Sequence, residues 1–286
     1  MMLSPKEFKK HLIETAISIL WDQWEKLGAW IGPGERFKFY SDPEAAVVFS
    51  GYFSRYEKRL QKISEEWISA NKEHLNTVRL KRMSKELSNE YGITVPTKLK
   101  IEVTGKSKFS KFIRELDVLL PENLLPRLRL LFGCSTKAEV IFHLLTAGNS
   151  NSNQIAKERF LNQKAVFIEL NKLARAGLLI EKTVGRERIF SISPNFVSVL
   201  PKPISSNSVS WVLLSAAFMV ERCLSDDYLD DEYLIFSTFN DFRKTLASML
   251  NKAMECNVSL KQESAQGFYS SVVDYWICLT KKATGR

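Results

Sequence analysis

Apolar residues recur three and four positions apart along most of this chain, which is the spacing of helices with one buried face. One such segment covers residues 4–26 and opens on Ser4, a residue type that caps helices. Others cover residues 42–67 and 75–90, and the last of these is rich in lysine and arginine. These segments predict a helical N-terminal domain over residues 1–115.

Two stretches rich in glycine, proline, serine or lysine interrupt the helical pattern. The first, residues 91–111, contains an alternating run at 98–106 that predicts one strand. The second, residues 198–210, contains several serines and two prolines and reads as a linker. The expected domains are therefore residues 1–115, 116–200 and 201–286.

The last domain has the pattern of a helical bundle. Residues 211–224 are apolar on almost every side, which predicts a helix at the centre of the bundle. The acidic cluster that follows could suggest a cation site, but it lacks the glycine and the spacing of a calcium loop. Capping of the next helix is the favoured interpretation of this cluster. Its members are Asp226, Asp227, Asp230, Asp231 and Glu232.

The central segment, residues 151–191, combines helical and strand patterns. Asn151 with Gln154 three residues later predicts a capped short helix. Asn162 is placed to cap a second helix, and Gly177 is suited to a left-handed end of that helix. The inner face of the second helix carries Val166, Leu170 and Leu173.

Two short strands follow this second helix. Residues 179–184 and 188–192 have strand patterns, and Gly185-Arg186-Glu187 form a hairpin turn between them. Two helices joined by a tight turn and followed by a two-stranded ribbon give the outline of a winged helix-turn-helix.

These motifs resemble the winged helix regulators of bacteria and archaea. The resemblance rests on the ten-residue spacing from Ala156 to Val166, the Leu170 and Leu173 pair, the AGLL sequence and the Gly-Arg wing. The preceding run, residues 127–145, is similar to the helix that opens this module, with Thr136 and Glu139 as its capping box. The expected fold class is mainly α: a helical N-terminal domain, a central winged helix-turn-helix with a small β-hairpin wing, and a C-terminal helical bundle.

The N-terminal half is similar to a family of winged helix proteins encoded near nucleotidyltransferase genes. The shared motifs are WEKLGAWIG, SDPEAAVVFSGYFSRYEKRLQKISEEWI and NTVRLKRM, and the similarity covers residues 20–195. It implies a regulator or an antitoxin-like partner and assigns no reaction.

Candidate DNA contacts lie on the second helix and on the wing, because this fold places the N-terminal residues of that helix in the major groove. Asn and Gln side chains can pair with adenine, and lysine can reach guanine or phosphate. The wing arginines would meet phosphate or the minor groove. The alternatives are that Asn162 only caps the helix and that the cations are solvated. The candidates are Asn162, Gln163, Lys164, Asn171, Lys172, Arg186 and Arg188.

Three aromatic or aliphatic residues depart from the family pattern. Phe160 occupies the turn position that is often glycine in such proteins. Phe167 and Ile168 lie where polar residues are commoner, and two adjacent large apolar groups are more often buried against protein. These two residues therefore favour a protein interface on the second helix.

The charge of the chain is compatible with nucleic acid. It has 286 residues, with 41 Lys and Arg against 32 Asp and Glu, and a formal net charge of +9. The excess lies in residues 1–131, with 23 cations against 17 anions, and in residues 132–200, with nine against five; residues 201–286 have nine against ten. The C-terminal part is thus the least suited to lie on DNA. A basic stripe of Arg55, Lys58, Arg59 and Lys62 predicts either phosphate contact or a solvated face.

No motif with the spacing of a catalytic, nucleotide-binding or metal site occurs in the sequence. We therefore expect no enzyme activity, no cofactor and no metal. The four cysteines lie far apart, which predicts free thiols in a reducing compartment. No apolar run is long enough to cross a bilayer, so we expect a cytoplasmic protein without membrane contact.

Two hypotheses follow from the sequence. The first is a DNA-binding transcriptional regulator that binds double-stranded DNA as a homodimer. The second is an antitoxin-like or protein-interaction module whose winged helix binds a partner such as a nucleotidyltransferase.

Overall fold

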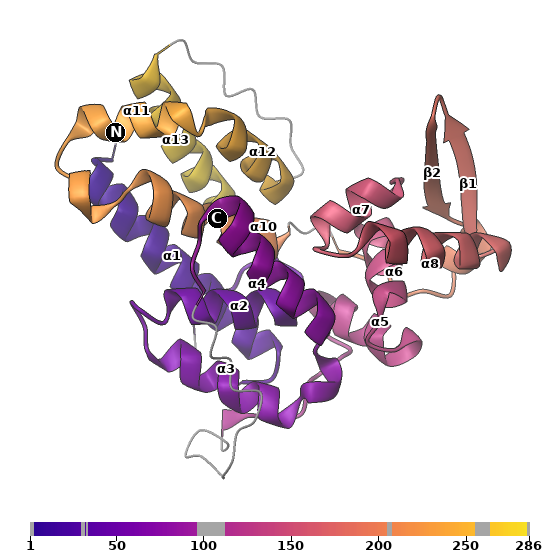
Figure 1. Ribbon diagram of the computed structural model, residues 1–286. Helices are drawn as coiled ribbons and strands as arrows, with labels where there is room; N and C mark the ends of the chain where they lie inside the picture. Colours follow the sequence, from indigo (N-terminus) through magenta and orange to yellow (C-terminus); the bar gives the residue numbers. More distant parts are fainter. Residues whose placement is uncertain are drawn as a thin grey trace.

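The computed structural model describes residues 3–29, 32, 34–95, 112–204, 208–254 and 264–284. The described chain is mainly helical, with one small antiparallel sheet of two strands (Figure 1). The helices are α1 (Pro5–Lys26), α2 (Pro43–Phe53), α3 (Arg59–Ala70), α4 (Thr77–Tyr91), α5 (Leu124–Phe132), α6 (Thr136–Thr146), α7 (Ser152–Glu158), α8 (Gln163–Arg175), α9 (Pro194–Val197), α10 (Val209–Phe218), α11 (Glu232–Asp241), α12 (Arg243–Met254) and α13 (Ala265–Thr284); the strands are β1 (Leu179–Val184) and β2 (Glu187–Ile192). Short 3₁₀ turns cover Lys72–His74, Pro121–Asn123 and Asp226–Tyr228, and a π-helical turn, η4 (Met219–Cys223), continues α10.

The predicted helix starts in the N-terminal half are confirmed by their caps. Ser4 and Glu7 form a complete capping box on α1. The Asp42 carboxylate accepts a hydrogen bond from the Ala45 amide at the start of α2. The single helix expected over residues 42–67 is wrong, because the chain turns at 54–58 and divides it into α2 and α3.

The N-terminal and C-terminal helices share one hydrophobic core. Residues of α1, α2, α3, α4 and α10 to α13 form a single cluster of buried side chains, and α10 is buried on every side, as its all-round apolar sequence predicts. Figure 1 shows α10 between α1, α2 and α12. We call this set of helices the body. The division of the chain into three domains stays a prediction.

The central helices build a second core. Apolar residues of α5 to α9 and of the strands form a separate cluster, to which Tyr40 also belongs. In Figure 1 this module, residues 124–200, extends away from the body, with the two strands at its far end. Phe160 belongs to the module by sequence but packs in the core of the body.

The two strands pair antiparallel from Leu179 with Ile192 to Val184 with Glu187. Gly185 has a φ of 61°, whereas the φ of Arg186 is not positive. This is the pattern of a two-residue type II′ turn. Ser150 joins β2 through two backbone hydrogen bonds with Phe190, of 2.9 and 3.1 Å. The Ser150 bridge thus attaches the two strands to the segment between α6 and α7, and the elements follow in the order α6, Ser150 bridge, α7, α8, β1, β2.

Three further predictions concern a strand, the acidic cluster and membrane spans. The strand expected at residues 98–106 lies outside the described residues. Asp231 caps α11 by accepting a hydrogen bond of 3.1 Å from the Leu234 amide, as expected for the acidic cluster. No helix in the described ranges is long and apolar enough to span a bilayer.

Candidate nucleic-acid interface

The caps and apolar spacing of α8 set which of its faces is exposed. The Asn162 side chain accepts a hydrogen bond of 3.2 Å from the Ala165 amide, so this residue does cap the helix. Val166, Leu170 and Leu173 are buried against the module core. At the other end, the Leu178 amide donates to the Leu173 carbonyl and the Gly177 amide to the Ala174 carbonyl, which is a complete Schellman motif with Gly177 at a φ of 72°.

The first turn of α8 presents polar side chains to solvent. Asn162, Gln163 and Lys164 are all exposed. Apart from the Asn162 cap, no hydrogen bond or ion pair involves these side chains within the described residues. Gln163 and Lys164 are therefore available for an external ligand.

Three other predicted contacts are engaged inside the module. The Asn171 amide group donates to the Phe167 carbonyl at 2.6 Å and its oxygen accepts from Arg188 at 2.7 Å. Lys172 pairs with Glu169 at 2.7 Å. For these residues a contact with DNA would first have to replace an existing intramolecular bond.

Arg188 is held from several sides at once. Its guanidinium donates two hydrogen bonds to the Glu181 carboxylate across the strand pair. Hydrogen bonding from Arg188 lowers the pKa of Glu181, so this pair stays ionised. The guanidinium also lies 5.2 Å from the ring centroid of Phe167 and 5.5 Å from that of Phe190. The geometry makes Arg188 a residue that fixes the ribbon against α8.

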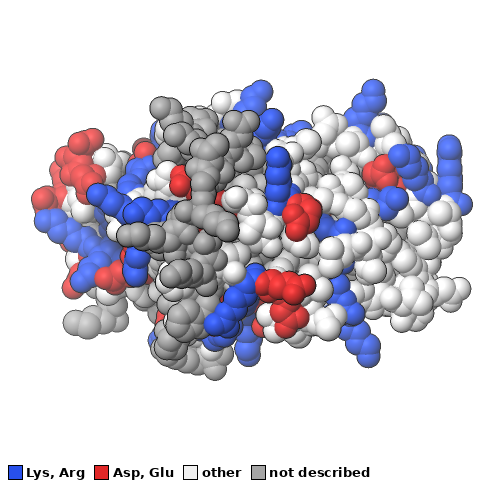
Figure 2. Space-filling view, turned by 90° about the horizontal axis from the view of Figure 1, so that it is seen from below, with Lys and Arg blue, Asp and Glu red and all other residues white. Residues whose placement is uncertain are grey.

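Arg186 contrasts with Arg188. It lies at the tip of the β-hairpin, is exposed, and has no ion pair within the described part of the chain. Seen from below in Figure 2, Lys and Arg side chains project from the end of the molecule that carries α8 and the strands, and acidic side chains are fewer there. Arg186 and Lys164 are two exposed cations of this end without an ion pair within the described residues.

The apolar pair on α8 is partly exposed. Phe167 is 40% and Ile168 43% exposed, although the Phe167 ring is covered on one side by Arg188. They lie one turn after Lys164, so cationic and apolar groups share this surface. A thymine methyl and an apolar group of a protein partner both fit such a surface.

The turn between α7 and α8 is attached to the body. Phe160 has a φ of 54°, the single positive value among the described non-glycine residues, and its ring is 1% exposed. The ring stacks on Trp211 at the start of α10, with centroids 5.4 Å apart. Trp211 also donates a hydrogen bond of 3.3 Å to the Glu158 carbonyl, and the Lys252 amine lies 3.9 Å from its ring centroid. Glycine adopts a positive φ at lower cost than phenylalanine, so this turn position carries backbone strain.

A buried network of six charged side chains lies beside this turn. Arg79 pairs with Asp42 at 2.6 Å and with Glu44 at 2.5 Å, and Arg129 makes a two-bonded pair with Glu44 at 2.7 and 2.9 Å. The remaining links join the network to α6 and α7: Arg129 and Arg159 both donate to Glu139, and Arg159 lies 3.6 Å from Asp42.

All six of these side chains are nearly or fully buried, with exposures of 6% or less. Burial alone would raise the pKa of Asp42 and Glu139, but the arginines outweigh it. The pKa of Asp42 is held well below its usual range, and that of Glu139 falls to about 2. Three cations therefore balance three anions in the interior.

This network was not predicted from the sequence, and the role expected for one of its members is wrong. Glu139 does not form a capping box with Thr136: Ser135 is the N-cap of α6 and makes no side-chain cap bond. Arg79 belongs to the segment noted in the sequence as rich in lysine and arginine, and its side chain is fully buried. The spacing could have indicated this burial: Arg79 lies four residues before Met83, so both side chains are on the same, inner face of α4.

Within the described residues, no group of three or more His, Cys, Asp or Glu side chains is placed to hold a metal ion. Comparison of the chain with family models, curated proteins and solved structures finds no match. The function is therefore inferred from the residues themselves.

Proposed function

We propose that this protein is a DNA-binding winged-helix protein and a transcriptional regulator. The first turn of α8 would read the major groove, and the ribbon of β1 and β2 would contact phosphate or the minor groove. The observation that carries the proposal is the order of α6, the Ser150 bridge, α7, α8, β1 and β2, which is the order expected for a winged helix. A two-fold homodimer would bind half-sites about one helical turn apart.

The chemistry of the exposed side chains supports this proposal. Gln163 can pair with an adenine edge, and Lys164 can reach guanine or phosphate from the same turn. Arg186 at the hairpin tip is available for phosphate. Residues 132–200 carry nine Lys and Arg against five Asp and Glu, which favours a polyanion on this module.

The experiment is to titrate the purified protein onto DNA from upstream of its own gene, with excess unrelated DNA, at several salt concentrations. We expect specific binding that weakens as salt increases. Lys164→Ala and Arg186→Ala should each weaken it, and Lys72→Ala, an exposed lysine outside the module, should not. Specific binding that neither Lys164→Ala nor Arg186→Ala changes would contradict these contacts.

A second candidate function is a protein-interaction module, antitoxin-like in character, whose α8 holds a partner such as a nucleotidyltransferase. The observation that favours it is the exposure of Phe167 and Ile168, since large apolar side chains on a surface often serve as interface anchors. Both functions are compatible in one protein, because an antitoxin can also bind operator DNA.

The test of this second candidate is co-expression with the product of the neighbouring gene. A double Phe167→Ser and Ile168→Ser variant should lose the co-purifying partner. A Val197→Ser variant, which alters another exposed apolar residue of the module, should retain it. Retention of the partner by the double variant would exclude α8 as the interface.

A further inference from the structure

A cavity of about 440 Å³ opens between the end of α2 and the first half of α3. Its lining includes Tyr52, Arg55, Lys58, Gln61, Lys62 and Glu65. Three of these side chains are cationic and one is anionic, and the Glu65 carboxylate already accepts a hydrogen bond of 2.9 Å from Gln61. The charge of the lining therefore suits a small anion.

The residues of the predicted basic stripe do not behave alike. Arg59 is paired with Glu57 at 2.8 Å, and it is absent from the cavity lining. Lys58 faces the cavity and has no ion pair within the described ranges. It is the side chain that a phosphate or carboxylate group could engage without breaking an existing bond.

Arg55 connects the cavity to α10. Its guanidinium lies 4.2 Å from the ring centroid of Tyr52 and pairs with Glu221 at 3.0 Å. Glu221 also accepts a hydrogen bond of 2.9 Å from the Tyr52 hydroxyl. The Arg55 and Glu221 side chains are 40% and 29% exposed, so an anion in the cavity can compete with Glu221 for Arg55.

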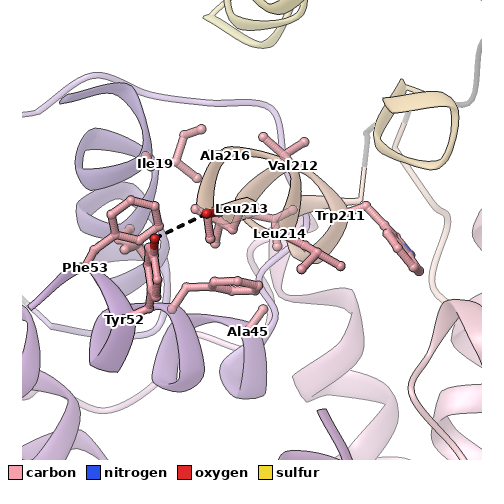
Figure 3. Close-up of a cluster of buried hydrophobic side chains, with 14 of the residues drawn as sticks. Ile19, Ala45, Tyr52, Phe53, Trp211, Val212, Leu213, Leu214 and Ala216 are labelled. Atoms are coloured by element: carbon pink, nitrogen blue, oxygen red, sulfur yellow. Dashed lines mark hydrogen bonds between the residues drawn. The ribbon is translucent and has the colours of Figure 1, made fainter. Parts of the chain in front are cut away.

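Glu221 lies in the π-helical turn that continues α10, a type of irregularity that is frequent at functional sites. The Ala217 carbonyl of α10 lies 3.2 Å from the Tyr52 hydroxyl and shares its single proton with Glu221. Figure 3 shows this bond at one end of α10 and Trp211 at the other, with apolar side chains packed between them. Ten residues, or about 15 Å of helix, separate Trp211 from Glu221.

We propose that this cavity binds a small ligand bearing a phosphate or carboxylate group, and that α10 transmits its binding to the turn before α8. The ligand takes Arg55 from Glu221, which removes the ion pair that ties η4 to the segment after α2. Movement of α10 then reaches Trp211 and the Phe160 ring stacked on it. The ligand site stands alone, whereas the effect on DNA rests on the function proposed above.

Calorimetric titration with inorganic phosphate, and separately with citrate, tests the site at constant pH and ionic strength. The wild-type protein should bind at least one of the two with a saturable one-to-one isotherm. Lys58→Gln should weaken that binding about tenfold, the worth of one charge-assisted hydrogen bond, and Lys72→Gln should leave it unchanged. Glu221→Gln should bind more tightly, because Arg55 then has no competing carboxylate.

Two calorimetric results would overturn the site. One is the absence of saturable binding of both anions to the wild type. The other is equal affinity in Lys58→Gln and Lys72→Gln. Circular dichroism of each variant identifies any loss of fold, which is not expected at exposed lysines.

DNA affinity with and without the bound anion, at fixed ionic strength, tests the transmission. The wild type should change its affinity about fivefold or more, and Lys58→Gln should not respond. A wild type that binds DNA but ignores the anion would overturn the transmission. A wild type that binds no DNA would overturn the proposed function, while the calorimetric titration would still decide whether the cavity binds an anion.

Discussion

Phe160 and Trp211 stack with an interplanar angle of 23°, and this contact joins the turn before α8 to the first turn of α10. The backbone of Phe160 is left-handed, a conformation that costs an L-residue about 1–2 kcal/mol. Burial of the ring against the body must offset that cost. Glycine would fit the turn without strain, so the presence of phenylalanine at position 160 is explained by its contact with Trp211 in the body.

Substitution of Phe160 should separate the strain from the stack. Phe160→Ala should lower the free energy of unfolding by about 3–5 kcal/mol, because it removes a buried ring. Phe160→Gly loses the same ring but tolerates the positive φ, so it should be more stable than the alanine variant by about 1 kcal/mol. Urea denaturation measures both. The control is the neighbouring Leu161, whose φ is not positive: there the Leu161→Gly variant should be less stable than the Leu161→Ala variant.

Local features of this fold were predictable from the sequence because their bonds are short in sequence. Ser4, Asp42, Asn151 and Asn162 each cap a helix by accepting a bond from an amide three residues later. The β-hairpin also follows from the adjacent strand patterns and Gly185. Such contacts need only the identities of neighbouring residues.

The junction between module and body was not predictable in the same way. Arg129 and Glu44 are 85 residues apart, and the local sequence around either residue does not indicate that they pair. Phe160 was visible as a departure from glycine, but its partner Trp211 lies 51 residues further along the chain. Helical spacing shows which face is buried, and the identity of the buried partner depends on the assembled fold.

Removal of one charge from the buried network should destabilise the protein strongly. Glu139→Gln leaves Arg129 and Arg159 short of an anion in the interior, so we expect a loss of about 3–5 kcal/mol in the free energy of unfolding. Glu181→Gln breaks an exposed pair with Arg188 and should have little effect. Urea denaturation at pH 7 measures both variants. Similar small losses in the two would show that the network is not a determinant of stability.

Stability should fall as the pH drops below 6.5, and His143 should account for much of the slope. Burial, with the charge of Arg159 second, lowers the pKa of His143 from 6.5 to about 3. Between these pH values His143 is protonated in the unfolded chain and neutral in the folded chain. The free energy of unfolding therefore falls toward acid by up to about 1.4 kcal/mol per pH unit.

The check is denaturation of wild type and His143→Gln between pH 7 and pH 5, above the ordinary pKa values of Asp and Glu side chains. The variant should show a shallower pH dependence than the wild type. His74→Gln is the matched control: burial also lowers the pKa of His74, but this side chain is more exposed, so its removal should reduce the slope less. An unchanged slope in His143→Gln would exclude His143 as the source.

The two arginines of the β-hairpin should separate into a structural and a contacting residue. Arg188→Met removes the bonds to Glu181 and Asn171 and should lower the thermal midpoint, with weaker DNA binding as an indirect result. Arg186→Met should leave the midpoint unchanged, weaken binding across all DNA sequences and reduce the salt slope by about one. Thermal denaturation and salt-dependent titration on the same preparations provide both readouts. If Arg186→Met keeps the wild-type salt slope, the hairpin tip is not a phosphate contact and the interface is confined to α8.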